Sequence, residues 1–189
     1  MYIDVIKKYQ PINEQEAVDK AAILAFINRN SDCLSRDNMI AHLTTSAIVV
    51  NMDLTKVVFA YHLIYKAWAW VGGHNDNDDD CLNVAIKEAK EETGLKNIEP
   101  YLNTPIMIDI IKVQNHIKHG KYIPDHLHLN LTYLLVADEN EELKIKEDEN
   151  SGVKWFALED MINITSEERM KPIYQKAFDF VNKLRNNRK

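Results

Sequence analysis

The sequence predicts an α/β (α+β) fold in which helices cover the faces of a mixed β-sheet. Runs with the helical period of 3.6 residues alternate along the chain with runs rich in β-branched residues, the pattern of a sheet packed against helices. The chain has 189 residues, of which 46% are hydrophobic, and this suffices for one sizeable core. Because the sequence contains no repeat, low-complexity segment or Gly/Ser/Pro linker, one main domain is expected.

The first 38 residues are expected to be helical. Apolar residues recur there at helical spacing behind the acidic stretch 13–16, which suits a helix N-terminus. These residues are Ala17, Val18, Ala21, Ala22, Ala25 and Phe26. We therefore divide the chain into an N-terminal helical extension (1–38), a main domain (39–185) and a tail (186–189). The extension is a candidate for a cap over a pocket or for a homodimer interface.

The main domain is expected to open with a β-hairpin. Residues 42–51 are dense in β-branched side chains, and a second strand-like run follows at 55–65 after a turn. Residues 67–73 predict a short buried strand that ends in a glycine turn, and residues 74–80 form a polar loop. Further strands are predicted at 104–113, 126–137 and 152–158, and helices at 81–93, 158–162 and 166–184.

Charge and cysteine content exclude several classes of function. The net charge of −6 argues against a nucleic acid as the main partner, because such binders carry a basic face that releases counterions. Cys33 and Cys81 have no metal-type spacing, so neither a disulfide framework nor a cysteine zinc site is expected. The N-terminus lacks an apolar signal region and no 18-residue apolar window occurs. We expect a cytoplasmic protein with no membrane partner.

The predicted helix at 81–93 concentrates acidic residues next to its buried face. Glu88, Glu91 and Glu92 have mutual spacings of three, four and one, so their carboxylates can converge on one point. Such a run also occurs on solvated helix faces, where Lys87 would simply pair with Glu91. Asp79 or Asp80 can cap the N-terminus of this helix, and Gly94 suits its C-terminal end. The stripe expected to be buried consists of Leu82, Ala85, Ile86 and Ala89.

The spacing around this helix resembles the Nudix box, G-x5-E-x7-R-E-U-x-E-E-x-G-U, in which U is aliphatic. Two positions depart from it: Asp79 is one methylene shorter than glutamate, and Lys87 offers a point charge in place of the bidentate fork of arginine. The matching residues are Gly73, Glu88, Glu91, Glu92, Gly94 and Leu95, with Ala89 as a small U residue. Residues 68–73 and 153–161 also resemble family segments, so the resemblance covers roughly 40–160.

The resemblance implies the α/β/α Nudix sandwich and a metal-dependent pyrophosphohydrolase. The expected substrate is a nucleoside diphosphate linked to another moiety, cleaved by water attack at phosphorus with Mg²⁺ or Mn²⁺ as cofactor. In the family, the positions of Asp79, Lys87, Gly73 and Gly94 brace the box. By the same resemblance Glu88, Glu91 and Glu92 are the catalytic and metal-binding residues, with the Gly72 carbonyl as a further ligand.

Other roles stay open at this point. Glu91 or Glu92 is a candidate general base, and so is His126 or His128, which alternate along a strand and face one way as candidate substrate contacts. Two rival functions share the fold: a non-catalytic nucleotide-sensing domain, and an isomerase of isoprenoid diphosphates. The isomerase would need a catalytic cysteine in the strand before the box, whereas Cys81 lies inside the box and Cys33 lies well upstream.

Overall fold

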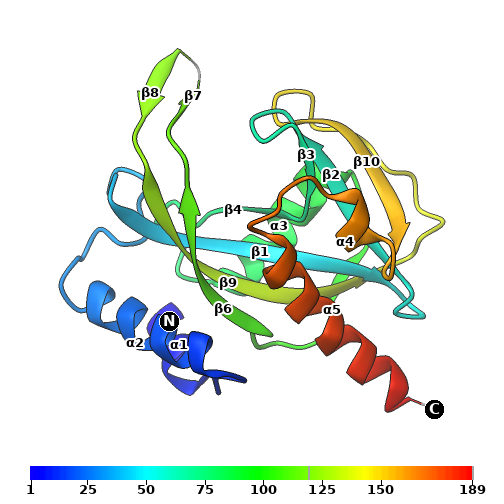
Figure 1. Cartoon of the computed structure of the whole chain (residues 1–189), viewed down its shortest axis with the longest axis horizontal. Helices are drawn as coiled ribbons and strands as arrows, with labels where there is room; N and C mark the ends of the chain where they lie inside the picture. Colours follow the sequence, from blue (N-terminus) through cyan, green and yellow to red (C-terminus); the bar gives the residue numbers. More distant parts are fainter. Residues whose placement is uncertain (119, 189) are drawn as a thin grey trace. The chain divides into compact units, whose positions relative to one another are not determined.

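The structure is a computed structural model that describes residues 1–118 and 120–188, and its element order is shown in Figure 1. The helices are α1 (Tyr2–Lys8), α2 (Glu14–Ile27), α3 (Cys81–Thr93), α4 (Met161–Ile164) and α5 (Lys171–Asn186). The strands are β1 (Ala41–Asn51), β2 (Lys56–His62), β3 (Ala67–Ala69), β4 (Val71–His74), β5 (Ile98–Pro100), β6 (Met107–Val113), β7 (His116–Lys118), β8 (Lys121–Ile123), β9 (His126–Ala137) and β10 (Asn150–Ala157). The predicted α/β (α+β) class with a mixed sheet is confirmed.

The chain divides into two compact units. The first contains Met1–Ser46, Gly73–Ala85 and Asn103–Tyr133. The second contains Ala47–Gly72, Ile86–Leu102 and the chain from Leu134 onward. Strands β1 and β9 contribute residues to both units, and the sheet to which they belong has the order β10-β2-β1-β9-β5, with β3 on β2, β4 on β1 and β6 on β9.

The first unit is built on the antiparallel pair of β6 with the beginning of β9. Seven residue pairs join them, from Met107↔Thr132 to Val113↔His126, and the β7–β8 hairpin extends from the end of this pair (Figure 1). Helix α2 is tied to β6 by Asp19, whose Oδ2 accepts a hydrogen bond from the Ile110 backbone N–H at 2.9 Å. This helix therefore satisfies a backbone donor of the strand.

The second unit centres on β2, which pairs antiparallel with β1, β3 and β10. Helix α5 places aromatic side chains against this strand: the Phe59 ring lies 5.1 Å from Tyr174 in an edge-to-face contact and 6.3 Å from Phe178. All three rings are almost fully buried. Burial of such rings dominates core energetics, so this cluster anchors α5 to the sheet.

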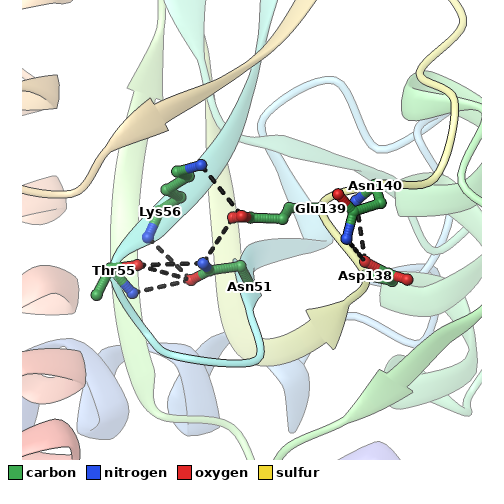
Figure 2. Close-up of polar contacts among 6 residues, drawn as sticks. All are labelled: Asn51, Thr55, Lys56, Asp138, Glu139 and Asn140. Carbon is green, nitrogen blue, oxygen red and sulfur yellow. Dashed lines mark hydrogen bonds and ion pairs between the residues drawn. The ribbon is translucent and has the colours of Figure 1, made fainter.

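The turn between β1 and β2 is held by one buried amide (Figure 2). Asn51 Oδ1 accepts hydrogen bonds from the backbone N–H groups of Thr55 (2.8 Å) and Lys56 (3.0 Å). Its Nδ2 donates to Glu139 Oε2 (2.7 Å), and Lys56 Nζ lies 3.2 Å from Glu139 Oε1. Because Asn51 is only 3% exposed, these contacts fix the hairpin register, Val50↔Val57, from inside the fold.

Several elements differ from the sequence-based expectation. Residues 28–38 form turns instead of helix, because polar side chains there bind local groups, as Asn30 does with the Phe26 carbonyl. The expected strand 67–73 splits at Trp70, since β3 pairs with β2 and β4 pairs with β1. Helix α5 begins at Lys171, with Pro172 in its first turn, and not at 166. The three-residue strands β5, β7 and β8 were not predicted.

The expected domain boundaries stay predictions. Helices α1 and α2 both fall within the proposed extension 1–38, and strand β1 begins just after it. Of the proposed tail 186–189, Asn186 is the last residue of α5 and Lys189 lies outside the described residues.

Candidate functional site

Helix α3 carries the three glutamates of the predicted site, and local contacts fix both of its ends. Asp80 Oδ1 accepts a hydrogen bond from the Asn83 backbone N–H at 3.1 Å, the capping contact expected at a helix N-terminus. Gly94 follows the last helical residue with φ of 75°, the left-handed conformation that glycine favours. The helix therefore has the bounds that the sequence predicts, Cys81–Thr93.

Two of the three glutamates meet a third carboxylate from a distant segment. Glu88 and Glu92 lie one helical turn apart on α3, and Glu149 comes from the turn that precedes β10. One carboxylate oxygen from each of the three lies within 4.8 Å of the other two. We call Glu88, Glu92 and Glu149 the carboxylate cluster. Oxygen donors gathered in this way suit a hard divalent cation such as Mg²⁺.

Glu92 is the most deeply buried member of the cluster. It is 1% exposed, and its Oε1 accepts a hydrogen bond from the Gly72 backbone N–H at 2.8 Å. Burial raises the pKa of Glu92 to about 8, although the Gly72 hydrogen bond acts in the opposite direction. Burial also raises the pKa of Glu88. At neutral pH Glu92 therefore favours a proton, or a bound cation, in place of full ionisation.

Glu91 lies outside the carboxylate cluster and has cationic partners instead. Its Oε2 is 3.0 Å from Lys146 Nζ, and its Oε1 is 3.9 Å from Lys87 Nζ. The Lys87–Glu91 contact is the i,i+4 pair that the sequence allows on a solvated helix face. Lys146 also lies 3.2 Å from Glu149. Burial alone would lower the pKa of Lys146, but the hydrogen bond that its ammonium donates to Glu91 and the charge of Glu149 raise it. The Lys146 ammonium thus bridges Glu91 to the cluster.

Glu149, Lys146 and Asn150 complete this site, and no sequence pattern predicts them. They lie more than 50 positions beyond α3 in a charged stretch without periodicity, so only the fold brings them to the helix. Asn150 fixes the approach, because its Nδ2 donates to the backbone carbonyl of Glu92 at 3.0 Å. The backbone of Lys144 adds a second tie, with its N–H 2.7 Å from the Thr93 carbonyl.

The residues expected to brace the box are found on both units. In the first unit, Gly73 belongs to β4 and Asp79 is exposed in the loop before α3. In the second, Lys87 is exposed and pairs with Glu91, and Gly94 closes the helix. A Cβ at Gly94 would lie 2.6 Å from the Lys144 Cβ, so a side chain at this position would displace the segment that delivers Lys146 and Glu149.

The two predicted strand histidines belong to a separate group of imidazoles in the first unit. His126 Nε2 lies 3.2 Å from His128 Nε2, which confirms that the two side chains share one face of β9. His42 on β1 and His74 on β4 stand beside them, with ring centroids 5.2 and 5.1 Å from His128. Sequence reasoning missed His42 and His74, because each is a lone histidine in its own segment.

A comparison with known protein families matches residues 41–177 to the NUDIX domain. The match begins at β1, contains the whole of α3 and the carboxylate cluster, and ends inside α5. A search of curated proteins found no match. None of the helices in residues 1–118 and 120–188 combines the length and apolar character needed to cross a bilayer.

Solved structures share the fold at low sequence identity. A NUDIX-family hydrolase from Clostridium perfringens is 23% identical with a TM-score of 0.53, and the alignment covers 74% of this chain and 97% of that one. The dihydroneopterin triphosphate pyrophosphohydrolase of E. coli is 12% identical, with a TM-score of 0.54 and coverages of 71% and 92%. A C. elegans Ap4A hydrolase is 18% identical, with a TM-score of 0.51 and coverages of 74% and 97%.

Proposed function

Because the chain belongs to the Nudix family of hydrolases, whose members act on diphosphate bonds, we propose that it is a metal-dependent pyrophosphohydrolase. The proposed substrate is a small molecule in which a nucleoside diphosphate is linked to another moiety. The observation that carries this proposal is the carboxylate cluster: two box glutamates and Glu149 within 4.8 Å of one another, at the helix that the box predicts.

The residues of the cluster fit Mg²⁺ or Mn²⁺. All three donors are carboxylate oxygens, which hard cations prefer. Glu92 is 1% exposed and ionises with difficulty in the protein alone, so a cation is the partner that would stabilise its charged form. We propose Glu88, Glu92 and Glu149 as metal ligands, with the Gly72 backbone carbonyl completing the set. The oxygens of Glu91 face Lys146 and Lys87, and we propose an acid–base role for it in place of the metal ligation that the resemblance implies. When bound, such metals neutralise the diphosphate and lower the pKa of a water that attacks phosphorus.

The chain's own groups orient this site. The Gly72 N–H holds Glu92 in one rotamer, and Asn150 fixes the helix end that carries it. Glu91 is partly exposed beside Lys146, where its carboxylate can accept a proton from water, and we propose it as the general base. Glu92 serves less well in that role because the Gly72 hydrogen bond occupies one of its oxygens. His126 and His128 are proposed to contact the substrate.

A hydrolysis assay tests the proposal. The protein is incubated with Mg²⁺ or Mn²⁺ and with nucleoside triphosphates, ADP-ribose, nucleotide sugars, dinucleotides and isopentenyl diphosphate, and the products are identified. We expect cleavage of a phosphoric anhydride bond, and a loss of roughly 100-fold or more in Glu88→Gln and Glu92→Gln. Glu99→Gln, on an exposed position of β5 in the same unit, is the matched control and should retain full activity.

The two rival functions predict other outcomes of the same assay. Binding of a nucleotide without turnover of any substrate would favour the sensing domain, and conversion of isopentenyl diphosphate would favour the isomerase. The structure gives a physical argument against a cysteine-dependent isomerase. Cys81 is buried, burial raises the pKa of its thiol, and its Sγ accepts a hydrogen bond from Asn75 Nδ2 at 3.3 Å. A thiol kept protonated in this way is a poor acid–base or nucleophilic group at neutral pH.

A further inference from the structure

Four imidazoles gather in the first unit, and the substrate contact proposed for His126 and His128 does not account for the other two. His42, His74, His126 and His128, which we call the histidine cluster, have neighbouring ring centroids 4.9 to 5.2 Å apart. One ring nitrogen from each of His42, His74 and His128 lies within 4.8 Å of the other two. They come from three separate strands, β1, β4 and β9, so the grouping is a product of the fold.

His42 has a buried nitrogen without a partner. The side chain is 3% exposed, and its Nδ1 lies 2.9 Å from the Asn38 backbone carbonyl. Because a carbonyl can only accept, Nδ1 carries the hydrogen and Nε2 presents a lone pair. Across residues 1–118 and 120–188, Nε2 has no hydrogen-bond partner. Leaving such an acceptor buried and unpaired is unfavourable, and a metal ion bound to Nε2 would offset that cost.

The contact between His126 and His128 fixes the tautomer of His128 in the same way. His126 Nδ1 lies 2.9 Å from the Pro124 carbonyl, so in the neutral form of this ring Nδ1 carries the hydrogen and Nε2 accepts. The 3.2 Å contact between the two Nε2 atoms then requires the hydrogen to be on His128. His128 is left with a lone pair on Nδ1. A histidine held by a hydrogen bond at one nitrogen and free at the other is the usual arrangement of a metal ligand.

Burial opposes a positive charge on His42, His74 and His128. Burial lowers the pKa of His74 to about 3, and burial likewise lowers the pKa of His42 and of His128. The nearby positive charge of Arg36 acts in the same direction, but its Nε donates to Asp76 Oδ1 at 2.7 Å and the pair is neutral as a whole. The positive charge of Lys118 also lowers the pKa of His74, but more weakly. Neutral imidazoles offer the lone pairs that a metal needs.

We propose that His42, His74 and His128 form a binding site for Zn²⁺, separate from the carboxylate cluster and different in chemistry. Imidazole nitrogens favour Zn²⁺ over Mg²⁺, which prefers oxygen. At a Zn–N distance of about 2.0–2.1 Å, tetrahedral ligand atoms lie about 3.4 Å apart, so small side-chain rotations from the present spacing suffice. Three protein ligands leave a fourth position for water or for an oxygen of a bound ligand. His126 is a positioning residue that holds the His128 tautomer.

Metal content and spectroscopy test the site directly. The full chain, without a polyhistidine tag, is treated with chelator, reloaded with Zn²⁺, desalted and analysed by elemental mass spectrometry. We expect one Zn²⁺ per chain in addition to any held by the carboxylate cluster. In the Glu88→Gln/Glu92→Gln double variant, that one Zn²⁺ should remain. Loaded instead with Co²⁺, this double variant should show the intense visible bands of four-coordinate nitrogen ligation, where a six-coordinate oxygen site gives weak ones.

Substitutions in the cluster supply the comparison. In the carboxylate-deficient background, His42→Ala and His128→Ala should weaken Zn²⁺ binding by roughly 100-fold, and His126→Asn by roughly 10-fold. His62→Ala, on β2 of the other unit, is the control and should bind as its parent does. If His42→Ala fails to fold by circular dichroism, the half-buried His74 gives a second variant, His74→Ala.

Equal Zn²⁺ retention by the histidine variants, no retention by the parent, or weak six-coordinate Co²⁺ bands would each overturn the proposal. None of these readouts requires turnover. A failed zinc site would therefore leave the hydrolase proposal standing, and an inactive enzyme would leave the zinc site standing.

Discussion

Glu92→Gln should make the metal-free protein more stable at neutral pH while removing its activity. Burial raises the pKa of the folded Glu92 carboxyl from its ordinary 4.5 to about 8. Below pH 4.5 the carboxyl is protonated in both the folded and unfolded chain, so it has no effect on the free energy of unfolding. As the pH rises from 4.5 to 8 the unfolded chain loses the proton and the folded chain keeps it, so stability falls.

The magnitude follows from the two pKa values. Each pH unit in this window lowers the free energy of unfolding by about 1.4 kcal/mol, which amounts to about 3 kcal/mol by pH 7. Glutamine stays neutral and can still accept the Gly72 hydrogen bond. In EDTA at pH 7, the variant should therefore melt roughly 6–12 °C above the wild type, and the difference should shrink toward pH 4.5.

Thermal and urea unfolding followed by tryptophan fluorescence, from pH 5 to 8 in EDTA, measures this difference. Glu99→Gln removes one exposed carboxylate from the same unit and should follow the wild-type curve at every pH. The reasoning is refuted if wild type and Glu92→Gln lose stability in parallel as the pH rises, or if the variant is the less stable protein at pH 8. Either result would mean that the Glu92 carboxylate is not held in an unfavourable environment.

The remaining predictions concern metal addition, packing and backbone. Mg²⁺ at about 100 times its Kd should stabilise the wild type by about 2.7 kcal/mol in a thermal shift assay and should leave Glu92→Gln almost unchanged. Asn51→Ala removes the acceptor of the Thr55 and Lys56 N–H groups and the hydrogen bond to Glu139, and it should cost about 2–3 kcal/mol in urea unfolding; a cost below 0.5 kcal/mol would contradict the inferred role. Gly94→Ala should cost at least about 2 kcal/mol, since its Cβ meets the segment at Lys144, and crystallography should show that segment displaced. Phe178→Ala should cost about 3–5 kcal/mol in the same unfolding measurement, and a smaller loss would mean that α5 is not anchored by its aromatic contacts.

Helix α3 was predictable to the residue because its determinants are local. The Asp80 cap, the helical period and the left-handed Gly94 all lie within one short stretch, so sequence spacing carries the information. Strands β7 and β8 were not predicted, since three residues are too few to show a period. These two strands pair with each other, so neither segment taken alone indicates a strand.

Only part of the candidate site could be predicted from the sequence, because the remaining residues come from a distant segment. Glu88 and Glu92 stand out by spacing, but Glu149 and Lys146 join them through chain reversal more than 50 residues later. The expected convergence of three box glutamates also depended on treating the helix alone. In the fold, Glu91 is drawn to lysine partners while Glu92 is buried, a distinction that sequence spacing cannot express.

The close approach of Lys144 to Gly94 gives that glycine a second structural role. Besides ending a helix, it leaves room for the loop at Lys144 to pack against the helix end, where the Lys144 N–H donates a hydrogen bond to the Thr93 carbonyl. A consequence for protein engineering follows: a redesign of the stretch 138–149 has to preserve the contact of Lys144 with this glycine, together with Glu139, Lys146 and Glu149. Grafting α3 onto another scaffold without that contact would carry over Glu88 and Glu92 but lose Glu149, the third member of the carboxylate cluster.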